Sequence, residues 1–261
     1  MKLHSQIVIC ILMLVFGDMY SQELPPIESF APRMYDADNQ NWDLSQSEEK
    51  YIYVANNKGL LEYNGANWNL YSTPNQTVMR SVHVLNDRVY SGCYMEFGYW
   101  KRDTNGTLEY YSLSEKIDRL IEDEEFWKIV SVKQWILFQS LDRIYVYDTI
   151  LDSFSIVEPE STIVKMYKID DDVYFQDFEN GVFKIVNGMA VQVISDPQIN
   201  DSRIANIFKH ENGLLLITAR KGFYEFSHNK LSKWEVPANN FLVDKTIYYY
   251  SGTHLKKALV L

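Results

Sequence analysis

Histidines and carboxylates are the residues of this chain whose types could bind a metal or perform acid–base chemistry. No two of the five histidines have the short spacing that metal sites favour; they are His4, His83, His210, His228 and His254. Two acidic runs, Glu122–Glu125 and Asp170–Asp172, lack the alternating ligand pattern of a calcium loop. We interpret both runs as solvated loop charge, with a cation site or a carboxylate pair as the alternative.

Motifs for covalent or nucleotide chemistry are absent from the sequence. It contains no G-x-S-x-G elbow, no glycine-rich loop that would cradle a phosphate, and no cysteine framework for a metal. We therefore expect no catalytic residue, no metal ligand and no cofactor. The chain is not expected to be an enzyme.

The densest aromatic cluster is the segment GCYMEFGYW, residues 92–100. Its rings could stack on a sugar or another flat ligand. We interpret Phe97, Tyr99 and Trp100 as packing residues, because other segments of the chain carry bulky strand residues at the same place. The turn before that strand offers better candidates for ligand contact, namely Tyr94, Met95 and Glu96.

A pattern of about forty residues repeats along the chain and indicates which elements must position these side chains. Each copy has a β-rich run, a turn, an aromatic strand, a polar turn and a further strand. The turns fall at Gly59, Gly98, Arg143, Gly181 and Gly222, so the steps between them are 39, 45, 38 and 41 residues. This is the period of a four-stranded propeller blade. We predict an all-β fold, a β-propeller of about five complete four-stranded blades plus a truncated sixth.

The repeat predicts the blade ranges, which are 42–75, 76–115, 126–159, 162–197 and 203–238, with a partial blade over 240–261. In the first blade we expect strands at Trp42–Ser45, Tyr51–Ala55, Gly59–Tyr63 and Trp68–Tyr71. Asn-Gly pairs at Asn64, Asn105 and Asn187, and His228-Asn229 in the fifth copy, mark the turn before each fourth strand, where positive φ is required. Residues 42–261 thus form the propeller domain, after an extended lead-in over 22–41.

The first 21 residues have the pattern of a secretory signal peptide. Lys2 and His4 precede an apolar run of about ten residues from Ile7, which is too short to span a bilayer core of roughly 30 Å. An uncleaved anchor is the alternative. Removal of this segment leaves Cys93 as the only cysteine, so we expect no intramolecular disulfide and a periplasmic or otherwise extracytoplasmic location.

The end of the sequence falls inside the repeat. Alignment of the last copies places Thr246 opposite Arg203, so the sixth copy stops at Leu261 within its second strand. We expect the chain to be a fragment or an incomplete gene product. Because radial repetition protects sheet edges only when the ring closes, the chain alone is expected to aggregate or to oligomerise.

The turns that precede the third strand of each copy are the predicted ligand-binding positions. Strand residues are needed for packing in every copy, whereas these turns are free to face a ligand at the propeller mouth. The candidate residues are Asn57, Lys58, Tyr94, Met95, Glu96, Asp142, Glu179, Asn180, Arg220 and Lys221.

Net charge argues against one class of partner. The formal net charge is -10, and no basic block interrupts the acidic residues. Phosphate backbones are bound mainly by Lys and Arg, so we expect no contact with nucleic acid. The expected partner is an unidentified small molecule or a partner protein domain.

Two segments carry a resemblance to a known family: NQNWDLSQSEEKYIYVANNKGLLEYNGANWNLY from Asn39 and MRSVHVLNDRVYSGCYMEFGYW from Met79. They resemble the amino-terminal part of the two-component-regulator-propeller sensors of Bacteroidetes, in particular the flavobacterial LuxR-type regulators with a triple-tyrosine domain. The resemblance implies a periplasmic propeller that senses a ligand, a carbohydrate in some relatives, followed by a triple-tyrosine domain, one membrane helix and a helix-turn-helix output. Contact with the membrane would come only through that downstream helix or an uncleaved signal segment.

The resemblance thus implies the sensing module of a transmembrane receptor that regulates transcription, here without its membrane-spanning and DNA-binding parts. A secreted or periplasmic scaffold for protein interaction is the alternative. A propeller glycosidase or lyase is a third possibility, which would need clustered acids or a histidine–metal site at the channel mouth.

Overall fold

The structure is a computed structural model that describes residues 27–118, 122–211, 213–242, 245–247, 253–255 and 258–260. The chain divides into two compact units, Met1–Ala31 and Pro32–Leu261. The first unit is described only over 27–31, where it carries no helix or strand. The expected signal peptide, 1–21, and the start of the lead-in lie outside the described residues, and the account below concerns the second unit.

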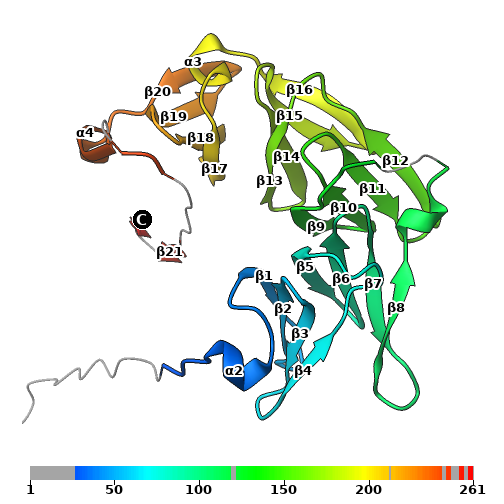
Figure 1. Cartoon of the computed structure of the whole chain (residues 1–261). Helices are drawn as coiled ribbons and strands as arrows, with labels where there is room; N and C mark the ends of the chain where they lie inside the picture. The colour runs from blue at the N-terminus through cyan, green and yellow to red at the C-terminus, as the bar shows by residue number, and fades with distance from the viewer. Residues whose placement is uncertain are drawn as a thin grey trace, which may run out of the picture. The chain divides into compact units, whose positions relative to one another are not determined.

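Five antiparallel four-stranded sheets make up the second unit, each with its strands in chain order (Figure 1). The first two sheets are β1(Asn41–Gln46), β2(Ile52–Asn56), β3(Gly59–Tyr63), β4(Trp68–Tyr71) and β5(Met79–Leu85), β6(Arg88–Cys93), β7(Phe97–Arg102), β8(Leu108–Ser112). The third is β9(Lys128–Val132), β10(Trp135–Gln139), β11(Ile144–Asp148), β12(Ser153–Val157). The last two are β13(Ile163–Ile169), β14(Asp172–Asp177), β15(Gly181–Val186), β16(Met189–Ile194) and β17(Ile204–His210), β18(Gly213–Thr218), β19(Gly222–Ser227), β20(Lys230–Lys233).

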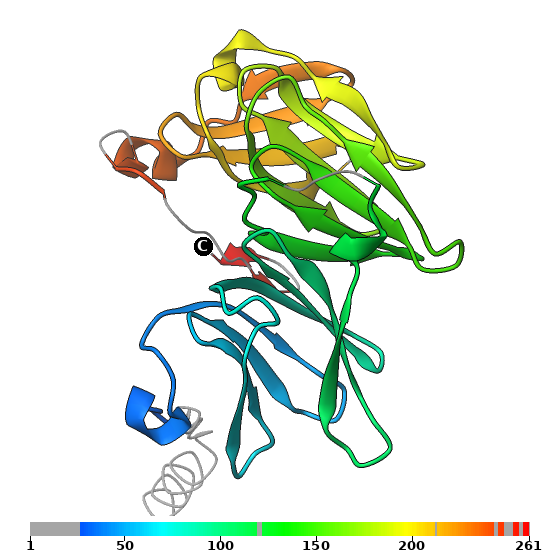
Figure 2. The same ribbon diagram turned by 45° about the vertical axis from the view of Figure 1, so that its right-hand side comes forward.

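The sheets are blades arranged one after another, with their first strands adjacent. Strand β5 contacts β1 and β9, and β13 contacts β9 and β17. Figure 2, a view turned from that of Figure 1, shows the same succession of sheets. The all-β propeller prediction with five complete blades is therefore confirmed.

Aromatic and aliphatic side chains hold neighbouring blades together. Between the second and third blades, the rings of Phe97 and Phe138 stack with centroids 4.4 Å apart, and Phe97 meets Phe126 edge-on at 4.6 Å. These three side chains are fully buried, and burial of each contributes roughly 1.5–3 kcal/mol. The interpretation of Phe97 as a packing residue is thus correct, and Trp100 is buried in the same manner.

Glycine at two of the turn anchors is required by close backbone contact. Gly59 has φ +142°, and a Cβ there would lie 2.1 Å from the carbonyl oxygen of Tyr71. The equivalent Gly181 has φ +105° and would place a Cβ 2.1 Å from the carbonyl oxygen of Ile194. Any side chain at these positions would collide with backbone that cannot move freely, which explains why the repeat is marked by glycine.

Short helical segments connect or precede the blades. The lead-in, expected to be extended, contains the one-turn helix α2(Pro32–Tyr35), and the ring of Tyr35 packs at 5.5 Å from that of Trp68. The other segments are η1(Ser114–Lys116), α3(Pro197–Asn200) and α4(Pro237–Leu242). The α3 helix begins after Asp196, whose side chain caps it by accepting a hydrogen bond from the backbone N–H of Gln198.

After α4 the chain returns to the fifth blade. The N–H of Ile247 donates to the carbonyl oxygen of Ala219 at 3.0 Å, as the N–H of Ile163 donates to that of Leu141 at 2.8 Å where the fourth blade begins. This equivalence agrees with the alignment that places Thr246 at the start of a sixth copy. The described residues further on form a hairpin of β21(Thr253–Leu255) and β22(Ala258–Val260). Leu261 lies outside the described residues.

Candidate functional site

The topology of a blade places two kinds of segment at one end of the propeller. Because the strands alternate in direction, the turn between the second and third strands and the start of the first strand lie at the same end. We call this end the channel mouth; it contains all ten predicted turn residues. In a propeller the first strands line the central channel, so their first residues surround its opening.

One strand position at the mouth recurs in every blade. The pairing of the first and second strands shifts by one residue between Asn41 and Asp43, between Met79 and Ser81, between Ile163 and Met166, and between Ile204 and Asn206. Such bulges redirect a side chain and are frequent at functional sites. Together with the position before β9, they define what we call the mouth ring: Trp42, Arg80, Trp127, Lys165 and Ala205.

Three members of the mouth ring form a stack. The guanidinium of Arg80 lies 4.1 Å from the ring centroid of Trp42 and 4.6 Å from that of Trp127. Its Nη2 and Nε donate to Oε1 of Glu125 at 2.8 and 3.1 Å, which fixes the guanidinium plane. Trp42 donates from Nε1 to Oδ1 of Asn57 at 2.8 Å and remains 41% exposed. The stack therefore offers a rigid, exposed indole next to a paired cation.

The mouth is also hollowed, at the fourth and fifth blades. A cavity of about 730 Å³ lies where the fourth and fifth blades meet, and the charged residues in the described part of its lining are Lys165, Asp201, Arg203, Arg220 and Lys221. A smaller cavity of about 210 Å³ shares Arg203, Val164 and Phe178 with it and extends to Leu141 of the third blade. A volume of several hundred Å³ is that of sites for small organic ligands.

Four of the predicted turn residues contribute to these features or lie beside them. Asn57 orients Trp42, and Arg220 and Lys221 line the larger cavity, where Lys221 is paired with Asp201. The N–H of Met95 donates to the carbonyl oxygen of Glu124, next to the partner of Arg80, at 2.7 Å.

The remaining predicted residues are held in their own blades or exposed away from the cavities. Glu96 accepts hydrogen bonds from the hydroxyls of Tyr110, Ser112 and Ser114, so its carboxylate is already used. Tyr94 donates to Asp123, and Asn180 to Asp177. Lys58, Asp142 and Glu179 are exposed, and no cavity described above is lined by them.

Sequence reasoning missed four residues of the mouth, Trp42, Arg80, Trp127 and Lys165. Each of the four immediately precedes the first regularly paired residue of its first strand. An alignment of the repeat copies on these strands would therefore have placed the four residues at one position. Trp42 lies in a strand, as expected, but the pairing shift beside it leaves no mark in the amino-acid pattern.

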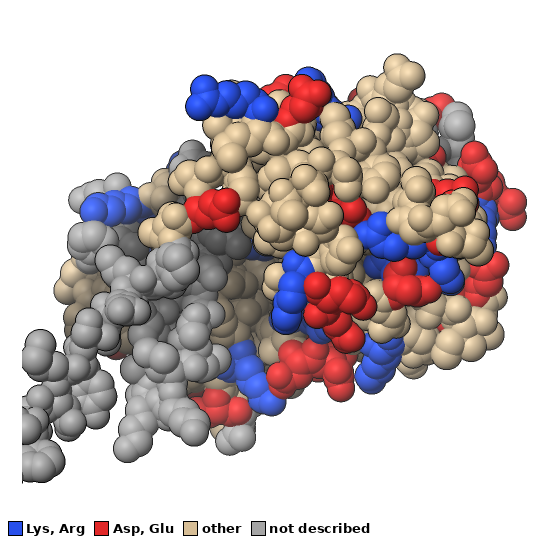
Figure 3. All heavy atoms as spheres, turned by 90° about the horizontal axis from the view of Figure 1, so that it is seen from below, with Lys and Arg blue, Asp and Glu red and all other residues tan. Residues whose placement is uncertain are grey.

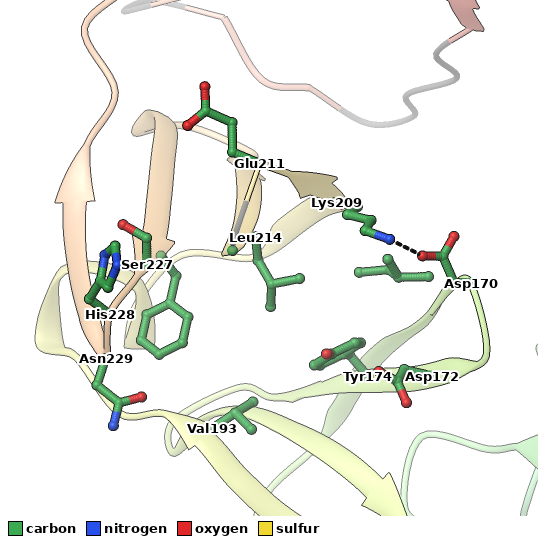
Figure 4. A pocket seen from close by; sticks show the side chains of 13 residues that line it. Asp170, Asp172, Tyr174, Val193, Lys209, Glu211, Leu214, Ser227, His228 and Asn229 are labelled. Carbon is green, nitrogen blue, oxygen red and sulfur yellow. Dashed lines mark hydrogen bonds and ion pairs between the residues drawn. The ribbon is translucent and has the colours of Figure 1, made fainter.

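A second hollow, of about 840 Å³, lies between the fourth and fifth blades near the opposite ends of their strands (Figure 4). Its wall includes the apolar side chains of Tyr174, Val193 and Leu214. At its rim Lys209 pairs with Asp170 at 2.6 Å, as Figure 4 shows. Asp172, on the same wall, pairs with Lys184 at 2.7 Å.

Reactive groups elsewhere are few among the described residues. Burial raises the pKa of the Cys93 thiol, which favours the unreactive protonated form. Within the described ranges no three His, Cys, Asp or Glu side chains are grouped so that they could hold a metal ion. No helix in the described part of the chain is long and apolar enough to cross a membrane. On the face drawn in Figure 3, acidic and basic side chains lie interspersed.

Comparison with known proteins gives structural matches only. No family model matches the chain, and no curated protein matches its sequence. Similar solved structures include two extracellular domains of putative hybrid two-component systems from B. thetaiotaomicron. One is 15% identical with a TM-score of 0.55, over 76% of this chain and 28% of that one. The other is 13% identical with a TM-score of 0.58, over 78% and 31%.

A virginiamycin B lyase from Staphylococcus aureus is also similar, at 14% identity and a TM-score of 0.57, over 78% of this chain and 73% of the lyase. The chain spans about a third or less of the two sensor domains. At these identities the matches establish the propeller fold. The resemblance named from the sequence is to the same kind of protein as these two sensor domains, and the structural likeness itself shows the fold alone.

Proposed function

We propose that this chain is an extracytoplasmic propeller module that senses a small ligand, a carbohydrate being the candidate class, for a transmembrane receptor that regulates transcription. The observation that carries the proposal is the stack of Trp42, Arg80 and Trp127 at the channel mouth. An exposed indole fixed by neighbours is a suitable platform for the apolar face of a sugar ring. The similarity to extracellular sensor domains supports the same role.

The exposed and fixed indole of the stack supports a role in recognition. A tryptophan that served only to bury apolar surface would be covered by a neighbouring blade, as Trp100 is at 4% exposure. Trp42 is instead 41% exposed while its ring is fixed on one face by Arg80 and at its edge by Asn57. Because the ring is already fixed before the ligand binds, the loss of side-chain entropy on binding is smaller. We propose no enzymatic activity for the site.

A thermal-shift screen of oligosaccharides tests the proposal. A ligand present at about 100 times its Kd stabilises the folded state by roughly 2.7 kcal/mol, which raises Tm by about 5 °C or more for a chain of this size. Trp42→Ala should abolish the shift, whereas Tyr111→Ala, which removes an aromatic ring of similar exposure from β8, should leave it unchanged. Equal shifts in the two variants would reject the mouth as the ligand site.

A second candidate function is a scaffold for protein contact. It is favoured by Ile150 and Leu151, which lie in the turn between β11 and β12 and are 76% and 73% exposed. Two adjacent exposed aliphatic side chains at a turn suit a partner protein more than a small molecule. Replacement of both by serine should weaken partner capture without changing any ligand-induced thermal shift; loss of the thermal shift as well would contradict two separate surfaces.

A further inference from the structure

Strand β16 is the outer strand of the fourth blade, and one of its backbone edges is unpaired. It pairs only with β15, and among the described residues no further strand joins the sheet beyond it (Figure 1). Its six residues, Met189–Ile194, include no charged residue and no proline. Met189 and Val191 are 66% and 46% exposed, and Ala190 and Gln192 are exposed as well. An uncharged, exposed edge of this kind is a template for pairing with another strand.

The outer strands of the other four blades are protected. Strand β20 carries Lys230 and Lys233, and β8 carries Glu109. Helix α2 contacts β4. Strand β12 is contacted by the fourth blade, where Oγ of Ser155 donates to the carbonyl oxygen of Gly188 at 3.3 Å. Charged side chains and covering segments are the usual means by which sheets prevent edge pairing. Strand β16 has no charged side chain, which indicates a strand that is free to pair.

The turn before β16 determines which backbone groups of the strand face outward. Asn187 and Gly188 have φ values of +51° and +76°, as in a two-residue type I′ turn. The residues that flank such a turn form a hydrogen-bonded pair, and from there non-hydrogen-bonded and hydrogen-bonded pairs alternate along the two strands. The second and fourth residues of β16, Ala190 and Gln192, therefore lie in non-hydrogen-bonded pairs with β15. The N–H and carbonyl groups of these two residues point away from β15 and are available to another strand.

We propose that β16 pairs with β16 of a second copy of this chain, antiparallel and about a two-fold axis at Val191. Ala190 of each copy then lies opposite Gln192 of the other, and the outward N–H and carbonyl groups of these residues form backbone hydrogen bonds. On one face of the joined sheets Val191 lies opposite its own copy, and Met189 lies opposite Val193. The central cross-strand pairs are therefore apolar, which stabilises the pairing.

A second copy suits this edge because the strand is complementary to itself. Antiparallel pairing brings no like charges opposite each other, since β16 contains no charged residue. The pairing uses the free edge of both strands, so the assembly closes at a dimer. A contact made by one strand edge buries less than the about 1,200 Å² of stable complexes, so we expect a weak dimer. The inference goes beyond the proposed function, because β16 is at the other edge of its sheet from the channel strand β13.

Sedimentation equilibrium of the full chain from about 1 to about 300 µM tests the self-association. We expect a monomer at the lowest concentration and a rising fraction of dimer above it. Hydrogen exchange then locates the contact. At high concentration the amides of Ala190 and Gln192 should exchange more slowly than at low concentration, whereas exchange in β20 should not change with concentration.

Two variants of β16 and one matched control assign the contact to this strand. Ala190→Pro removes an outward N–H and leaves the hydrogen bonds to β15 in place. Val191→Lys places two like charges opposite each other at the axis. Each should weaken dimerisation at least about tenfold. Ser232→Lys should leave dimerisation unchanged, because exposed Ser232 has the same register in β20 as Val191 has in β16 but lies in another blade.

Three results would overturn the inference. The first is a mass that stays that of the monomer over the whole concentration range. The second is self-association that both β16 variants leave unchanged, and the third is concentration-dependent protection that does not include Ala190 and Gln192; either would place the contact on another surface. Circular dichroism and Tm of each variant at about 1 µM, where a weak dimer is dissociated, identify a variant that does not fold. The exchange measurement on the unchanged chain decides the question in that case.

Discussion

Replacement of His83 by glutamine should reduce the loss of stability that acid causes. His83 lies on β5, partly buried, and its Nε2 is 2.8 Å from Oγ of Ser131 on β9. Burial, followed by the positive charges of Lys128 and Lys168, lowers its pKa from 6.5 to about 4. The folded protein therefore holds this side chain neutral in a pH range where the unfolded chain protonates it.

The sign and the size of the effect follow from proton linkage. Between pH 6.5 and about 4 the unfolded state binds more protons at this site, so the free energy of unfolding falls as pH falls. Above pH 6.5, the pKa of His83 in the unfolded chain, His83 is neutral in both states and causes no loss of stability. A difference of about 2.5 between the two pKa values, at roughly 1.4 kcal/mol for each, corresponds to a loss of about 3 kcal/mol near pH 4.

Urea unfolding, followed by tryptophan fluorescence from about pH 7 to about pH 4, measures this loss. Carboxylates also titrate in this range, so the informative quantity is the difference between proteins. Over this interval the free energy of unfolding of wild type should fall by about 3 kcal/mol more than that of His83→Gln. The control His228→Gln changes an exposed turn residue and should lose as much as wild type. Parallel losses in wild type and His83→Gln would refute the claim that His83 is held neutral by its surroundings.

Three further predictions concern the packing of the blades. Arg143→Met removes the cation paired with the fully buried carboxylate of Glu124 and should lower the free energy of unfolding by about 3–5 kcal/mol in urea titrations; adding Glu124→Gln should recover part of that loss. Gly59→Ala should cost about 3 kcal/mol, because its Cβ would collide with backbone, whereas Gly65→Ala, with nothing within 4 Å, should cost no more than about 1 kcal/mol by the same assay. Cys93 should resist thiol labelling at mildly alkaline pH until the chain is unfolded, as mass spectrometry of its peptide would show; rapid labelling of the native protein would contradict its burial.

The strand positions were predictable because the repeat depends on backbone requirements that leave a mark in the sequence. Gly59 and Gly181 mark the turn before the third strand because a side chain there would meet a carbonyl oxygen. Arg143 marks the same turn without glycine. There the Oγ of Ser140 accepts from the N–H groups of Asp142 and Arg143, so a side chain closes the turn.

The ligand-binding turns were less predictable, because the use of a side chain depends on contacts between strands. Glu96 follows the turn residues Tyr94 and Met95 and looks equally available in the sequence. In the structure three hydroxyls from β8 and the segment after it donate to its carboxylate. Arg220, by contrast, is exposed at a cavity. Only tertiary pairing distinguishes the two positions.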